Sequence, residues 1–122
     1  MELNIYKKEE ILKAIETLTL ATTYIATPEQ WIQGAMAEDA VGNPVNYEGS
    51  SAVCFCVLGA MNRAGSNLGG SALAINTLYK SADKIDSINY ISLVNYNDKA
   101  GRTHKEILEL FQLAIDTLDK EL

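Results

Sequence analysis

Apolar residues recur at helical spacing near both ends of the chain. Within residues 5–20 they form one stripe, which predicts an amphipathic helix with Asn4 as its N-cap. Near the C-terminus, Thr103 and Glu106 have the spacing of a capping box. The apolar positions behind this box keep helical spacing as far as Leu118. We expect this last helix to pack against the first helix and against a central apolar segment.

After the first helix, the sequence predicts turns and short strands. Residues 27–30 are typical of a helix start, but Gly34 limits any helix there to one or two turns. We predict a short hairpin over residues 31–47, with its turn at residues 41–44.

Residues 52–61 form a continuous apolar run, in which periodicity does not separate helix from strand. The length of the run and the two serines before it favour a buried helix ending at Gly65, whereas its β-branched and aromatic residues favour a strand. We take helix as the prediction, followed by a loop and by a further helix capped by Ser71. Residues 85–95 alternate polar and apolar positions and are expected to be extended, in part or throughout.

These elements predict a mostly helical α+β fold with about four helices and one short β-hairpin. The length of 122 residues suits a single domain, residues 1–122, whose core needs neither disulfide nor metal. We find no signal peptide and no apolar stretch long enough to span a membrane. We therefore expect a cytoplasmic protein in which Cys54 and Cys56 are reduced and buried.

The net charge of −6 argues against non-specific nucleic-acid binding, which needs clustered Lys and Arg. An acidic surface could bind a basic partner, although a charge of this size also serves solubility alone. The charge therefore argues against one class of partner, nucleic acid, but does not identify the partner.

Motifs for catalysis or metal binding are not evident in the sequence. Cys54 and Cys56 would diverge on a helix, and on a strand they would still lack two of the ligands that zinc needs. The single histidine, His104, has no recognisable nucleophile beside it. Glycine-rich residues 65–70 lack the Lys-Ser or Lys-Thr of a phosphate-binding loop. We therefore expect no metal and no cofactor, and we favour a protein without enzymatic activity.

Residues 96–104 are the strongest candidate for a binding site. They lead through a loop into the last helix, where backbone N–H groups and the helix dipole attract anions. Arg102 offers a planar fork for phosphate or carboxylate, and neighbouring polar and aromatic groups could bind the rest of a ligand. The candidate ligand-binding residues are Trp31, Tyr96, Asn97, Asp98, Arg102, Thr103 and His104.

The same residues also fit a purely structural role. Asn97 and Asp98 favour turns, Gly101 permits an unusual backbone conformation, and Thr103 is a natural helix cap. Arg102 could pair with Asp98 across the turn. The sequence leaves both interpretations open.

Three sequence elements resemble those of an uncharacterised family of small proteins from phages and bacteria, notably actinobacteria. The elements are Trp-x-x-Gly at residues 31–34, Gly-Ala at 59–60, and Tyr-Asn-Asp at 96–98 with Gly-Arg-Thr at 101–103. The resemblance spans most of residues 8–118, and Tyr96 stands where the family pattern has Trp. No activity is assigned to the family. The resemblance implies one domain, a helix over residues 51–64, and a phage or mobile-element setting.

Two functions fit these observations best. The first is a non-enzymatic protein that binds or sequesters a small anionic, nucleotide-like signalling molecule and so blocks a host process such as defence. The second is a protein-interaction module that inhibits a host protein through its acidic or apolar surface. A small hydrolase using His104 ranks last. A homo-oligomer is compatible with so small a chain, and the sequence does not identify the ligand.

Overall fold

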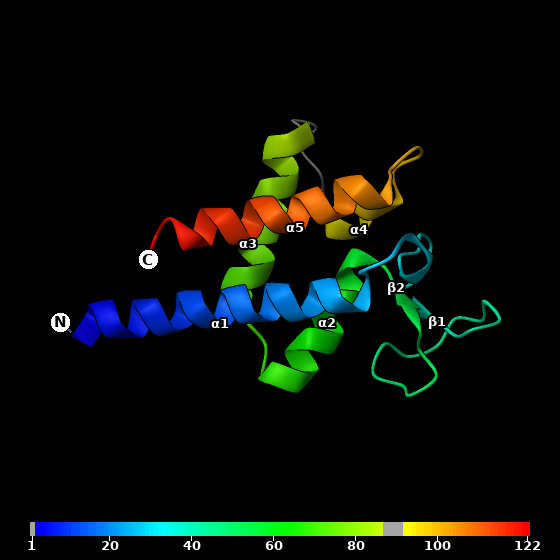
Figure 1. Ribbon diagram of the computed structural model, residues 1–122, viewed down its shortest axis with the longest axis horizontal. Helices are drawn as coiled ribbons and strands as arrows, with labels where there is room; N and C mark the ends of the chain where they lie inside the picture. Colours follow the sequence, from blue (N-terminus) through cyan, green and yellow to red (C-terminus); the bar gives the residue numbers. More distant parts are fainter. Residues whose placement is uncertain (1, 87–91) are drawn as a thin grey trace.

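Two long helices, α1 (Glu2–Tyr24) and α5 (His104–Asp119), lie side by side and run antiparallel, so that the two chain ends lie at the same end of the molecule (Figure 1). The computed structural model describes residues 2–86 and 92–122. Helix α3 (Ala72–Asp86) crosses this pair and contacts both of its helices, and α2 (Val57–Leu68) packs against α1. The capping box predicted at Thr103 and Glu106 is confirmed at the start of α5.

The core lies between these four helices and consists of aliphatic and aromatic side chains. Full burial of one such side chain stabilises the fold by about 1.5–3 kcal/mol. Alanines occupy several fully buried positions of α1 and α2, where a small side chain lets helix axes approach closely. The largest fully buried apolar side chains are Tyr96, Phe111, Ile11, Leu18, Ile25, Leu78, Ile107, Leu110 and Val57.

A two-stranded antiparallel sheet lies beyond the C-terminal end of α1. Strand β1 (Ala37–Glu38) pairs with β2 (Cys54–Phe55), with Ala37 opposite Phe55. The predicted turn forms, since the N–H of Val45 donates to the carbonyl of Ala37. The return strand predicted at residues 45–47 is wrong, since only a single bridge, between Glu38 and Pro44, joins the arms of the turn, and the strand that pairs with β1 is Cys54–Phe55.

The apolar run at residues 52–61 divides between strand and helix. Its first part pairs with β1, and the N–H of Cys56 donates to the carbonyl of Met36. Cys56 is the N-cap of α2, so the helix predicted to begin near residue 51 begins at Val57. It also ends later than predicted, at Leu68, because Gly69 adopts the left-handed conformation (φ +91°) of a helix C-cap.

The remaining predictions are confirmed in part. Helix α1 begins two residues before the predicted cap Asn4, and a single 3-10 turn, η1 (Pro28–Gln30), follows it. The Ser71 hydroxyl accepts the N–H of Ala74 at the start of α3, as predicted. Residues 85–95 were expected to be extended in part or throughout, but 85–86 end α3 and 93–95 begin the short helix α4 (Leu93–Asp98), whereas residues 87–91 lie outside the described residues.

The principal neighbours of α5 are α1 and α3 rather than α1 and the central apolar helix. Among the described residues, no helix combines the length and the apolar character that a bilayer crossing requires. The fold is the small, mostly helical α+β domain that the pattern of apolar residues predicts.

Replacement of Gly59 by Ala should destabilise the fold strongly. A Cβ atom at Gly59 would overlap the backbone carbonyl of Met36, which cannot move without displacing the chain before β1. We expect a loss of about 3 kcal/mol, the upper end for overpacking. Gly65→Ala is the matched control in the same helix, since its Cβ would lie at an ordinary 3.4 Å from Gly70. Urea denaturation of both variants tests this, and equal midpoints would contradict it.

Candidate functional site

Asn97 is fully buried in α4, and its side-chain amide hydrogen-bonds to two other parts of the chain and to the adjacent Asp98. Its Oδ1 accepts from the indole Nε1 of Trp31 (2.7 Å) and from the backbone N–H of Val57 (3.0 Å). Its Nδ2 donates to the carbonyl of Ile32 (3.0 Å) and to Oδ1 of Asp98 (2.8 Å). Both lone-pair positions and both N–H groups of the amide are used. We call these five residues the Asn97 junction.

Gln33 and Gly34, the two residues after Ile32, add further hydrogen bonds between the segment that follows η1 and the end of α4. The Nε2 of Gln33 donates to the carbonyls of Asn97 and Lys99, each at 3.0 Å, at the helix end where carbonyls lack intrahelical partners. The N–H of Gly34 donates to Oδ1 of Asp98 at 3.1 Å. Gly34 has φ +85°, a conformation that a residue with a side chain rarely adopts.

Arg102 is buried, and acidic residues compensate its charge. Its guanidinium pairs with Asp86 at the end of α3 (2.8 Å) and with Glu106 (3.2 Å), and its Nε donates to the carbonyl of Tyr96 (2.9 Å). The guanidinium carbon lies 3.7 Å from the centre of the Tyr96 ring, a close cation–π contact. The predicted pairing of Arg102 with Asp98 is wrong, since the Asp98 carboxylate bonds within the Asn97 junction instead.

Thr103 and His104 connect the start of α5 to the end of α1. The Thr103 hydroxyl accepts the N–H of Glu106, whose carboxylate accepts the N–H of Thr103 (2.9 Å). This last bond is the main reason why the pKa of Glu106 is lowered, and the Thr103 hydroxyl and the charge of Arg102 lower it further. The Nε2 of His104 lies 2.7 Å from the carbonyl of Ile25, and because a carbonyl only accepts, Nε2 carries the proton.

The structure therefore gathers the seven predicted site residues at one end of the molecule and gives most of their polar groups partners within the chain. Trp31, Asn97 and Asp98 meet in the Asn97 junction, whereas Tyr96 lies beneath Arg102. These contacts describe a structural role. Ligand binding by these residues remains a prediction.

Arg63 on α2 is a candidate that the sequence analysis missed. Its Nη1 donates to the carbonyls of Tyr47 (2.9 Å) and Gly49 (3.0 Å), and its guanidinium lies over the rings of Tyr24 and Phe55 at 5.4 and 5.3 Å. Within the described residues, Arg63 has no carboxylate partner, and neither its Nε nor its Nη2 has an acceptor. It borders a cavity of about 250 Å³, lined by Thr23, Tyr24, Gln30, Ala52, Val53, Phe55 and Arg63.

One signal in the sequence could have pointed to Arg63. Residues 49–82 contain no Asp or Glu, so Arg63 has no acidic neighbour one turn away on its helix. A half-buried cation in such a segment depends on backbone carbonyls and aromatic rings for its stabilisation. This absence of nearby acids marks Arg63 as a charge still able to receive an anion.

The two cysteines are buried as predicted, and both thiols are free. Burial raises the pKa of Cys54 and of Cys56, which holds both as neutral thiols. No cluster of three or more His, Cys, Asp or Glu that could hold a metal occurs in the described part of the chain.

The family model described as "Family of unknown function (DUF6197)" matches residues 10–117. The chain belongs to this family. No curated protein and no solved structure is detectably similar to the chain. The match of this DUF6197 chain covers both the Asn97 junction and the Arg63 cavity, which are therefore parts of the family domain.

Replacement of Asn97 by Asp should destabilise the fold by about 3 kcal/mol, because a carboxylate would face the carbonyl of Ile32 and the carboxylate of Asp98 without a proton to donate. Asn95→Asp is the matched control, since Asn95 is exposed on the same short helix. Chemical denaturation measures both. Equal stability of the two variants would show that the Asn97 amide is dispensable.

The bond between Glu106 and Thr103 should make stability depend on pH. The pKa of Glu106 is lowered from 4.5 in the folded state, so its contribution is present above that pH and is lost as the pH falls through the folded-state pKa. Glu106→Gln removes the titrating group while keeping an acceptor oxygen. The wild-type protein should be more stable than this variant near neutral pH, and thermal denaturation should show that the difference in stability disappears in acid. An advantage independent of pH would contradict this.

Proposed function

We propose that this protein is a non-enzymatic binding protein that receives a small anionic molecule at Arg63. The observation that carries this proposal is a guanidinium that lies on the wall of a cavity and has no carboxylate partner among the residues that the structure describes. Carbonyls hold Nη1 of Arg63, which leaves the Nε and Nη2 edge for a ligand. Two parallel N–H groups on such an edge match the paired oxygens of a phosphate or carboxylate.

Arg63 is a better anion site than Arg102. The side chain of Arg102 is 3% exposed and already pairs with two carboxylates, so an anion would have to displace Asp86 or Glu106. Arg63 requires no such exchange. Tyr24 and Phe55 beside it supply aromatic surface for the body of a ligand such as a nucleotide.

The resemblance to small phage and bacterial proteins supports a setting for this activity. There the protein would sequester a host signalling molecule and so block a process such as defence. The two free, buried thiols favour the cytoplasm, where cysteines stay reduced.

A second candidate function is inhibition of a host protein by direct contact. It is favoured by apolar side chains exposed on the chain around the sheet, where Val41 is 81% and Val53 is 47% exposed. Val53 also lines the Arg63 cavity, so a partner covering it would cover the cavity as well.

A thermal-shift screen against inorganic phosphate, mononucleotides, cyclic nucleotides and sugar phosphates tests the proposal. A ligand at 100 times its dissociation constant stabilises the folded state by about 2.7 kcal/mol. We expect Arg63→Gln to abolish the shift. Lys80→Gln removes the same charge from an exposed position on α3 and should leave the shift unchanged.

Two results would count against the anion site. One is the absence of any shift at millimolar concentrations of these probes, and the other is a shift that Arg63→Gln leaves intact. A stable complex with a host protein that survives Arg63→Gln and is lost on Val41→Asp would instead support the second function.

A further inference from the structure

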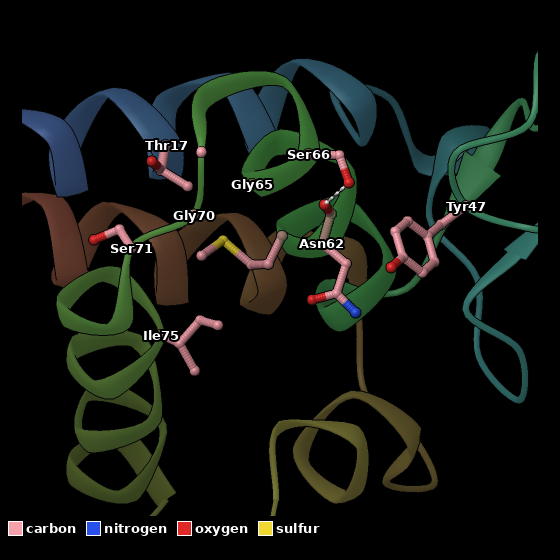
Figure 2. Close-up of a pocket in the computed structure, with 10 residues that line it drawn as sticks. Thr17, Tyr47, Asn62, Gly65, Ser66, Gly70, Ser71 and Ile75 are labelled. Carbon is pink, nitrogen blue, oxygen red and sulfur yellow. Dashed lines mark hydrogen bonds between the residues drawn. The ribbon is translucent and has the colours of Figure 1, made fainter.

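We infer a second ligand site, for an uncharged planar heterocycle of the nucleobase type, in a cavity between α2, α3 and Tyr47 (Figure 2). This inference goes beyond the anion site, because the cavity has no charged residue in its lining. Its volume is about 370 Å³. The lining residues are Thr17, Tyr47, Met61, Asn62, Gly65, Ser66, Gly69, Gly70, Ser71 and Ile75.

Side chains approach this cavity from two sides. Figure 2 shows Ile75 of α3 and Ser71, which directly precedes α3, on one side, and Asn62 of α2 with the Tyr47 ring on the other. Gly70 lies between the two helices with φ +75°, and no atom lies within 4 Å of the place where its Cβ would be. Gly70 therefore contributes only backbone to the wall of the cavity.

Two polar groups of the lining have no hydrogen-bond partner in the described part of the chain. Neither the side-chain amide of Asn62 nor the hydroxyl of Tyr47 has a hydrogen-bond partner among the described residues, although the backbone carbonyl of Asn62 accepts the hydroxyl of Ser66 (3.1 Å). An amide offers one acceptor and two donors in a single plane. This arrangement suits the edge of a heterocycle that carries a donor beside an acceptor, as an Asn side chain binds adenine.

The rest of the lining fits the faces and the charge of such a ring. Met61 and Ile75 supply apolar contact for a flat ring, and polarisable methionine sulfur packs well against aromatic systems. A charged ligand group would lose its hydration here without gaining an opposite charge. The cavity therefore favours a neutral ring.

The second site can be separated from the anion site by mutation. Asn62 and Arg63 are neighbours on α2, but the cavities that they line differ otherwise. Tyr47 contributes its carbonyl to Arg63 and its ring to the neutral cavity. Loss of the Tyr47 hydroxyl alone therefore affects the neutral site and leaves the bond to Arg63 in place.

Titration of the purified protein with adenosine and with uridine, followed by calorimetry, tests the inference. We expect saturable binding of at least one of the two nucleosides. Asn62→Leu, which replaces the amide by an apolar group of similar branched shape, should weaken it about tenfold or more, as the loss of hydrogen bonds worth about 1.4 kcal/mol would. Tyr47→Phe should weaken it by a smaller factor.

Two controls separate this site from a general effect on the fold. Asn76→Leu changes an exposed asparagine of α3 outside the cavity, and Lys80→Gln removes an exposed charge from the same helix; both should leave nucleoside affinity unchanged. The inference is overturned if neither nucleoside binds, or if binding is undiminished in both Asn62→Leu and Tyr47→Phe. Equal loss of binding in Asn76→Leu or Lys80→Gln would also overturn it.

Discussion

The side-chain amide of Asn97 is the interaction on which the arrangement of the other elements depends. A buried amide without partners costs roughly 2–7 kcal/mol, so its four hydrogen bonds have to form together. They fix the segment behind η1 against the start of α2 and against α4. Arg102 and His104 then attach α5 to the same end of the molecule, through α3 and through the end of α1. The sheet and the α4–α5 loop follow from these contacts.

The contacts of Asn97 distinguish the residues that hold the fold together from those that are available for binding. Trp31 and residues 96–104 look like a ligand site in the sequence, but in the structure most of their polar groups compensate one another. Uncompensated groups lie elsewhere, on α2. Arg63 keeps a charge without a carboxylate partner within the described chain, and Asn62 keeps an amide without a hydrogen-bond partner there. Both side chains are half-buried beside cavities, so a ligand can reach them without displacing a protein partner, which makes them the better candidates for binding.

Features that depend on nearby residues could be predicted from the sequence, and those that depend on distant residues could not. The capping box and apolar stripe of α5 are local signals, and both were read correctly. The turn at residues 41–44 forms as predicted, but the strand that pairs with β1 lies beyond it, at Cys54–Phe55, which the local pattern does not indicate. Residues 96–104 could be singled out by their composition. The compensation of Arg102 could not be foreseen, because Asp86 lies 16 positions away.

Native-state hydrogen exchange tests the dependence on Asn97 most directly. The indole N–H of Trp31 and the backbone N–H of Val57 donate to the same oxygen of Asn97, although they lie in different segments. If the amide holds these segments together, both hydrogens should exchange only through global unfolding, with the free energy measured for the buried N–H groups of α5. Fast exchange of either hydrogen while α5 stays protected would show that the junction opens by itself and does not hold the fold together.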